Sequence, residues 1–323
     1  GKPHTLTKFT VDEATPLAQG HHFTCDDDKS YTAAGKYTLS GKNTRILDGS
    51  GASVTSNYDI TEGTGTLTIG KKQVTVSGIK AKNKVYDGNS KAELDLSGAV
   101  IEGAAEGEKL SFDPSKIHGE FQQTSAGDNI PVKITFEQGA ITGADGTDPE
   151  NYALSDQSQS EATADITKRI VTVKAEDDSS TYGNAAPDKD FEAVFSGFAD
   201  GEDEGTVQGR DGIAFKVVKK GSSADQAQAY SGSTGAGEYN IVPDVSGLSA
   251  ENYAFQADDS GILTVDRRTV TISGRGSVTK TYDGRRGAVI TDDNYTFGNL
   301  ANGDTLVLKS WDASYDSKDA GDK

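Results

Sequence analysis

The sequence QVTVSGIKAKNKVYDG, residues 73–88, combines an alternating apolar run with a Tyr-Asp-Gly turn. Val74 and Val76 alternate with polar residues, a pattern typical of a strand that is buried on one face. Gly88 follows Asp87, and an Asp-Gly pair supplies the positive φ of a tight turn at low steric cost. The stretch therefore predicts a half-buried strand that leads to a turn carrying Tyr86.

The same combination recurs twice further along the chain, as IVTVKAEDDSSTYGN at 170–184 and as TVTISGRGSVTKTYDG at 269–284. Val74, Val171 and Val270 are 97 and 99 residues apart. A catalytic site is normally written once in a chain, whereas recurrence at a fixed period is typical of tandem structural modules. The recurrence therefore indicates repeated structural modules rather than a catalytic site.

Tyrosines occupy several of the recurring positions. Tyr86, Tyr182 and Tyr282 stand in the turns, and Asn-Tyr pairs stand at 57–58, 151–152 and 252–253. Tyr37 and Tyr239 each stand two residues after the glycine of an Ala-Gly pair. We expect the rings to lie on the core while the hydroxyls reach loop backbone, as in the tyrosine corners of sandwich domains. In the Asn-Tyr pairs, we expect the Asn side chain to cap a turn at the entrance of a strand.

Aligned on these repeats, the chain divides into two complete modules at 73–169 and 170–268 and two incomplete ones at 1–72 and 269–323. A complete module has the size of one immunoglobulin-like domain. Residues 73–169 contain no run of about ten residues with the apolar spacing of a helix. We therefore predict an all-β fold of tandem immunoglobulin-like β-sandwich modules, built from short antiparallel strands and arranged as an elongated array. β-Grasp-like modules remain the alternative.

The chain of 323 residues has a formal net charge of −18, from 32 basic and 50 acidic residues. This charge repels phosphate backbones and anionic lipid head groups, so we expect no nucleic-acid partner. No apolar run approaches the ~18 residues that cross a bilayer, so we expect no membrane insertion in this segment. Cys25 is the single cysteine, so we predict no intrachain disulfide. The sequence offers it no convincing base with a third group to orient that base, so we predict no nucleophile there.

No combination of residues outside the repeats points to catalysis, so we predict no enzyme, no catalytic residue, no metal site and no cofactor. The acidic segments CDDDK at 25–29 and GADGTDPEN at 143–151 leave one alternative open. They carry several oxygen ligands, and Ca²⁺ takes six to eight of them. Neither segment follows an EF-hand pattern, so we favour solvated loops over calcium sites.

One segment departs from the repeat. Tyr182 and Gly237 are 55 residues apart, whereas the corresponding Tyr86 and Gly127 are 41 residues apart. The insertion falls within 216–235, and loops between strands are where recognition is usually carried. If the chain binds a partner, we expect the contact there, with candidate ligand residues Lys219, Lys220, Gln226 and Tyr230. A mobile, solvated loop is the alternative.

KVYDG at 84–88, KTYDG at 280–284, STYGNAAPD at 180–188 and AGEYNIV at 236–242 resemble the YDG-type and MBG-type repeat modules of large bacterial surface adhesins. The resemblance implies an extracellular location on the bacterial cell surface and no catalytic residues. It implies adhesion to a host glycoprotein such as mucin or immunoglobulin, or projection of a binding domain, with neighbouring modules of the same array as further partners. A pure stalk or spacer without a ligand of its own is the alternative.

Overall fold

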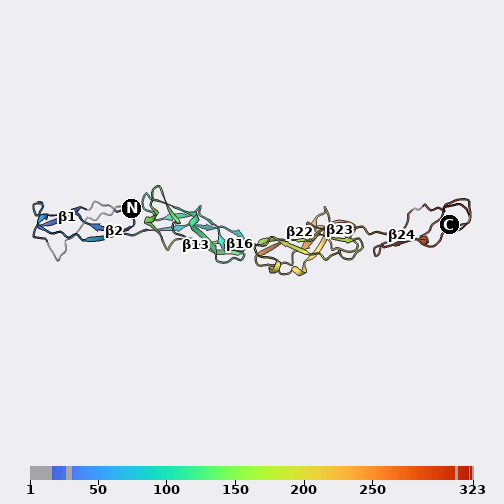
Figure 1. The fold of residues 1–323 in the computed structure, drawn as a ribbon. Coiled ribbons are helices and arrows are strands. Elements are labelled where there is room, and N and C mark those ends of the chain that lie inside the picture. Colours follow the sequence, from blue (N-terminus) through green and yellow to red (C-terminus); the bar gives the residue numbers. More distant parts are fainter. Residues whose placement is uncertain (1–16, 27–30, 310–311, 320, 322–323) are drawn as a thin grey trace. The chain divides into compact units, whose positions relative to one another are not determined.

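The computed structural model of the protein describes residues 17–26, 31–309, 312–319 and 321 (Figure 1). These residues form β-strands, turns and short 3-10 helices, and no α-helix occurs among them. Alternating side chains along a strand point in turn to the core and to solvent, which explains why the alternating runs became strands. The all-β prediction is confirmed. The β-grasp alternative is wrong for the described residues, because a β-grasp module needs a helix.

The short helices all lie at turns. They are η1 (Thr55–Asn57), η2 (Pro114–Lys116), η3 (Pro149–Asn151), η4 (Glu204–Thr206), η5 (Arg210–Gly212), η6 (Ala224–Gln226) and η7 (Asp292–Asn294).

The chain divides into two compact units. The first comprises Gly1–Lys84 and Asn89–Ile166, and the second comprises Val85–Gly88 and Thr167–Lys323. The first Tyr-Asp-Gly turn therefore belongs to the second unit, although the residues on both sides of it belong to the first.

Two antiparallel pairs open the first unit: β1 (His22–Asp26) with β3 (Lys42–Leu47), and β2 (Gly35–Ser40) with β4 (Thr64–Ile69). Residues 73–169 then build two main sheets. The larger has the order β7 (Lys84–Val85), β16 (Glu161–Thr167), β13 (Gly127–Phe136), β12 (Ile117–Phe121), β8 (Lys91–Ala92); the smaller has the order β10 (Val100–Glu102), β5 (Lys72–Ser77), β15 (Tyr152–Leu154). The pairs β11 (Lys109–Phe112) with β14 (Ile141–Ala144) and β6 (Lys80–Ala81) with β9 (Leu94–Asp95) complete the module.

The second unit repeats this plan in residues 170–268. A four-stranded sheet has the order β18 (Asp178–Thr181), β23 (Gly261–Asp266), β21 (Gly237–Asp244), β20 (Ala214–Lys219), and a three-stranded sheet has the order β19 (Ala193–Ser196), β17 (Arg169–Ala175), β22 (Tyr253–Asp258). The last antiparallel pair is β24 (Thr271–Gly274) with β25 (Tyr295–Gly298).

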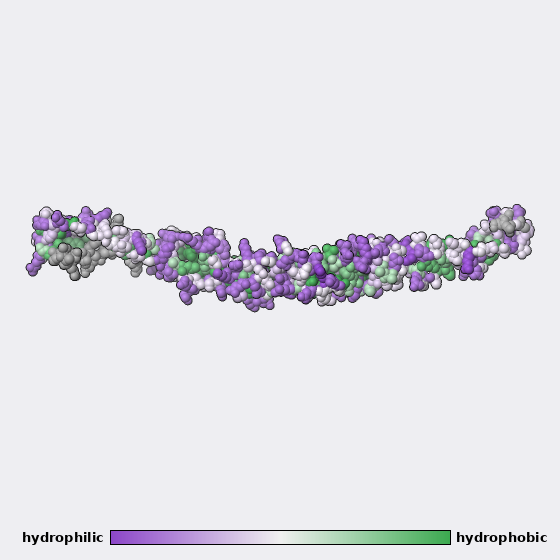
Figure 2. Space-filling view, turned by 60° about the horizontal axis from the view of Figure 1, so that its bottom comes forward, coloured by the Kyte–Doolittle hydropathy of each residue, from purple (hydrophilic) through white to green (hydrophobic). Residues whose placement is uncertain are grey.

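Each complete module has a core between its two sheets. In the first unit the core contains Val76 of β5 together with Ile117 and Ile134 of the larger sheet. In the second unit Ala175 of β17 packs with Ile241 and Leu263 of the four-stranded sheet. Side chains that meet from two facing sheets are the mark of a sandwich. On the face drawn in Figure 2, hydrophilic residues dominate and the hydrophobic patches are small and separated.

Strand direction differs from the antiparallel expectation. β5 pairs in parallel with β15, and β17 pairs in parallel with β22. β18 likewise runs parallel to β23. Parallel neighbours need a long crossover connection, and most of the module, including β18, β20 and β21 of the opposite sheet, lies between β17 and β22 in the chain. In the two complete modules, the alternating run that opens the module is therefore a central strand beside the strand of the Asn-Tyr pair.

The third alternating run is not equivalent to the other two. Val76 and Val173 are 1% and 0% exposed, but Ile272 of β24 is 58% exposed. β24 pairs only with β25 among the described residues, and no second sheet covers its other face there.

Candidate functional site

Tyr86 in the first Tyr-Gly turn is buried against a carboxylate. Its hydroxyl donates a 2.6 Å hydrogen bond to Oε1 of Glu202, and its ring meets that of Tyr253 edge-on at 5.6 Å. A Cβ on Gly88, whose φ is +79°, would lie 3.9 Å from Cβ of Ala199. The hydrogen bond to Glu202, followed by burial, raises the pKa of Tyr86 to about 12. The whole turn therefore rests on Ala199 and Glu202.

Tyr182 in the second turn repeats the contact. Its hydroxyl donates to Oδ1 of Asp304 at 3.2 Å, which raises the pKa of this tyrosine. A Cβ on Gly183, whose φ is +89°, would lie 2.5 Å from Cβ of Ala301, so only glycine fits there. Arg268 also donates to the carbonyl of Tyr182 at 2.6 Å. Tyrosine against a carboxylate and glycine against an alanine is thus a repeated arrangement.

The alanine and the carboxylate belong to a recurring four-residue turn that our sequence analysis missed. We call its copies the Ala-Gly-acid turns: AEGE at 105–108, ADGE at 199–202 and ANGD at 301–304. In each, the amide of the acidic residue donates 3.0 Å to the carbonyl of the alanine, and the third residue is a glycine with a φ between +80° and +90°. The similar offsets of 31, 28 and 31 residues from Val74, Val171 and Val270 were the available signal, but a motif of one alanine, one glycine and one acidic residue is too short to stand out in the sequence.

A second tyrosine binds the same carboxylate from within its own module. Tyr253 donates to Oε2 of Glu202 at 2.6 Å and accepts from the amide of Ala199 at 3.1 Å. Tyr152 makes the same two bonds with Glu108 and Ala105. Burial, then the bond to the carboxylate, raises the pKa of both tyrosines. These hydroxyls bind carboxylates as well as backbone, whereas we expected backbone alone.

The remaining recurring residues are also engaged. Tyr37 and Tyr239 donate to the carbonyls of Ala33 and Gly235, four residues earlier in both cases, which confirms the tyrosine-corner prediction for them. The prediction for the Asn-Tyr pairs is wrong at Asn151. Its side-chain oxygen accepts from the amide of Ala34 at 2.6 Å, and Asp148 caps the adjacent 3-10 helix instead.

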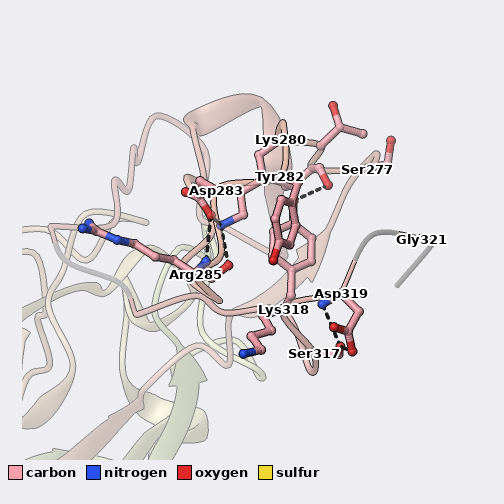
Figure 3. Close-up of a pocket in the computed structure, with 12 residues that line it drawn as sticks. Ser277, Lys280, Tyr282, Asp283, Arg285, Ser317, Lys318, Asp319 and Gly321 are labelled. Atoms are coloured by element: carbon pink, nitrogen blue, oxygen red, sulfur yellow. Dashed lines mark hydrogen bonds and ion pairs between the residues drawn. The ribbon is translucent and has the colours of Figure 1, made fainter.

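A lysine stabilises the Tyr-Asp-Gly turn from inside. Nζ of Lys84 donates to the carbonyl of Lys91 at 3.1 Å and lies 5.4 Å from the centroid of the Phe121 ring. Nζ of Lys280 donates to the carbonyls of Arg285 and Gly287 at 2.7 and 2.9 Å and lies 5.6 Å from the Tyr315 ring. Figure 3 shows Lys280 turned toward Asp283, and their ion pair lowers the pKa of Asp283.

Ser180 stands where the other two modules have this lysine. It is 1% exposed, and its Oγ is 2.7 Å from the hydroxyl of Tyr230. Tyr230 also donates to the carbonyl of Asn184 at 3.2 Å and packs on the core of its module. The insertion therefore supplies an internal hydroxyl in place of the missing ammonium group.

The structure separates the four candidate ligand residues. Lys219, Lys220 and Gln226 are exposed, and Lys220 forms an ion pair of 2.8 Å with Glu238. Tyr230 is turned inward, and no hydrogen bond joins any two of the four. Part of the insertion is strand rather than loop, because β20 extends to Lys219 and Gln228 exchanges two backbone bonds with Val217. A partner at this insertion stays a prediction.

Tyr282 in the third turn is not buried, so our expectation of three equivalent tyrosines is wrong there. It is 64% exposed, and a Cβ on Gly284, whose φ is +75°, would meet nothing within 4 Å. No described residue binds its hydroxyl. An open hollow of about 420 Å³ lies beside it, lined among others by Lys280, Arg285 and Lys318 (Figure 3). The other two turns are covered by Ala-Gly-acid turns, and no such turn contacts Tyr282 in the described part.

The carboxylates of segment 143–151 are engaged separately. Asp145 pairs with Lys109 at 2.7 Å, Glu150 pairs with Lys71 at 3.0 Å, and Asp148 accepts an amide as a helix cap. Asp27 and its neighbours to residue 30 lie outside the described residues. Within the described part no group of three or more His, Cys, Asp or Glu side chains is arranged to hold a metal ion. No helix there is long and apolar enough to span a membrane.

Comparison with known families follows the modular geometry. The model of the YDG domain matches residues 70–161 and 266–323, and the model of the MBG domain of YGX type matches residues 171–264. The chain contains YDG and MBG domains. The MBG domain is the module with Ser180 and Tyr230, and the YDG matches contain the lysines at 84 and 280. No curated protein matches the chain.

Proposed function

We propose that this chain is a non-enzymatic repeat region of a secreted bacterial surface adhesin, which binds a host glycoprotein or projects a binding domain. The observation that carries the proposal is the use of the recurring side chains. Tyr86, Tyr182 and Tyr253 all bind carboxylates within the fold. Residues engaged in this way serve the modules rather than a reaction.

The exposed part of the insertion is the place on the MBG domain where a host contact fits best. Lys219 and Lys220 bring positive charge to a chain with a net charge of −18, and Gln226 adds a donor and an acceptor on an exposed 3-10 helix. Sialylated or sulfated glycans of mucin carry negative charge, which such lysines attract. Tyr230 contributes to the fold and not to this surface.

The experiment measures binding of the full chain to immobilised mucin and to immobilised immunoglobulin, with serum albumin as the reference surface. The test variant carries Lys219→Ala, Lys220→Ala and Gln226→Ala. A matched control carries Lys80→Ala, Lys91→Ala and Gln157→Ala, which are also exposed. We expect the test variant to lose at least about tenfold in affinity at an unchanged melting temperature, and the control to bind as the parent chain does. Equal binding by both variants would refute the contact at the insertion.

The second candidate function is a spacer without its own ligand. The inward position of Tyr230 favours it, because the insertion then presents no aromatic anchor, and aromatic anchors dominate protein interfaces. A chain that binds neither mucin nor immunoglobulin above the reference surface would support this candidate.

A further inference from the structure

The glycine of the turn at Tyr282 has the left-handed φ of the glycines in the two covered turns, but no described residue covers it. Gly88, Gly183 and Gly284 have φ values of +79°, +89° and +75°. Lys280 holds this turn through two carbonyls, as Lys84 holds the first. The third turn is therefore preorganised for the contact that the first two make, and a preorganised surface loses little entropy on binding.

The covered turns define what a partner must supply. Each partner presents an alanine methyl to the glycine and a carboxylate to the tyrosine hydroxyl: Ala199 and Glu202 in one case, Ala301 and Asp304 in the other. At the first turn an aromatic ring, Tyr253, also lies edge-on against the tyrosine. The same pair of contacts at two places in one chain constitutes a rule of recognition.

We propose that the surface of Tyr282 and Gly284 is a docking site for the Ala-Gly-acid turn of a further YDG- or MBG-type module. The carboxylate of that turn accepts the hydrogen bond of the Tyr282 hydroxyl, and its alanine packs on Gly284. Tyr282 is 64% exposed, and docking removes this apolar ring from water. The occupant is a protein module, so this inference goes beyond the proposed host contact and does not depend on it.

Disulfide trapping between full-length chains tests the register of the contact. In the covered turn, a Cβ on Gly88 is 3.9 Å from Cβ of Ala199, which is within the Cβ separation of about 3.5–4.5 Å that a disulfide needs. Every chain carries Cys25→Ser. The donor chain carries Gly284→Cys, and the acceptor chain carries Ala199→Cys with Tyr86→Ala, which removes the tyrosine that binds Glu202 in the acceptor's own turn.

Gly276→Cys is the matched control donor. Gly276 has a φ of +71°, close to that of Gly284, and a Cβ there also meets nothing within 4 Å. We expect the heterodimer to form at least about tenfold faster from Gly284→Cys than from Gly276→Cys, because docking raises the effective thiol concentration. Tyr282→Ala in the donor should remove this excess.

A second acceptor, Ala105→Cys in the Ala-Gly-acid turn at 105–108, keeps the test decisive if the first acceptor does not fold, because none of the three Tyr-Gly turns has its glycine against that alanine. Equal rates for the two donors with the folded acceptors would overturn the proposal. An excess that survives Tyr282→Ala would also overturn it, because the tyrosine would then not carry the contact. Failure of the chain to bind mucin or immunoglobulin leaves these rates unaffected, so the two proposals are tested separately.

Discussion

Glu202 shows how one recurring side chain holds several parts of a unit together. Its two carboxylate oxygens accept the hydroxyls of Tyr86 and Tyr253, both at 2.6 Å. Hydrogen bonds to an ionised acceptor are stronger than neutral ones, and a buried donor that loses its acceptor keeps its desolvation penalty. Both rings are buried, so water cannot readily replace the carboxylate.

Replacing Glu202 by alanine should therefore destabilise the second unit. We expect Glu202→Ala to lower the free energy of unfolding by about 2–4 kcal/mol, since each of two buried hydroxyls loses its acceptor at about 1–3 kcal/mol. Denaturant unfolding followed by circular dichroism measures the change. Asp200 lies in the same turn and is exposed, so Asp200→Ala is the control and should change the free energy of unfolding by less than about 0.5 kcal/mol. Equal effects of the two variants would contradict this role of Glu202.

The raised pKa of Tyr86 predicts a loss of stability in alkali. The pKa of the Tyr86 hydroxyl rises from 10.0 in the unfolded chain to about 12 in the fold, and the main cause is the hydrogen bond that Glu202 accepts from it. The unfolded chain then releases this proton at a lower pH than the folded chain does, so stability falls as pH rises between the two values. The stabilising contribution is complete below pH 10.0 and is lost through about pH 12.

Tyr86→Phe measures this contribution. The difference in unfolding free energy between the parent chain and Tyr86→Phe should be constant below pH 10.0 and should shrink toward zero near pH 12. Denaturant titrations at several pH values give this difference. A difference that does not change over this interval would show that the hydroxyl proton is not held by the fold.

At the scale of elements, the three modules stabilise the Tyr-Gly turn with two different kinds of hydrogen-bond donor. The turn after the first strand needs donors for its inward carbonyls, and Lys84 and Lys280 provide an ammonium group. The MBG domain has Ser180 there and brings Tyr230 from the insertion between β20 and β21. The insertion thus also stabilises the fold, and a deletion within 221–233 that included Tyr230 would remove this contact together with the exposed Gln226.

A double-mutant cycle tests the coupling between Ser180 and Tyr230. We expect Ser180→Ala and Tyr230→Phe each to cost about 1 kcal/mol, and the double variant to cost less than their sum by about 0.5 kcal/mol or more. The exposed pair Ser231 and Ser233, whose hydroxyl oxygens are 2.9 Å apart in the same insertion, is the control and should show additivity. Additive costs at Ser180 and Tyr230 would show that the two hydroxyls act independently.

At the scale of the whole molecule, the chain has two compact units with separate cores. Chains with more than one core depart from two-state unfolding. Each unit should therefore give its own transition when the chain is heated.

Scanning calorimetry of the full chain should resolve at least two transitions. Glu202→Ala should lower the midpoint of one of them by roughly 4–16 °C, because each of the expected 2–4 kcal/mol corresponds to about 2–4 °C in a unit of 150–250 residues. The other transition belongs to the first unit, which does not contain Glu202 or either tyrosine that it binds, and should stay in place. One transition that moves as a whole would indicate a single cooperative block.

The all-β class and the position of most strands could be predicted from residues alone. The run at 73–76 became β5 and the run at 170–173 became β17, with Val74, Val76, Val171 and Val173 buried as the alternation predicted. Two features could not be predicted. Parallel pairing of β17 with β22 depends on a crossover of many residues, and the Ala-Gly-acid turns are too short to distinguish from ordinary surface turns.

The sequence by itself determined the repeat, because alternating apolar residues and turn glycines are local sequence features, and every module contains its own copy of them. Only the tertiary structure decided what the tyrosines do. The same Tyr-Gly turn is buried at Tyr86 and 64% exposed at Tyr282, because burial depends on an Ala-Gly-acid turn more than 100 residues away in the chain. The acceptor of each hydroxyl is a long-range partner, and no local pattern around the tyrosine specifies it. The inward position of Tyr230 has the same origin, since its hydroxyl bonds with Ser180, which stands 50 residues earlier.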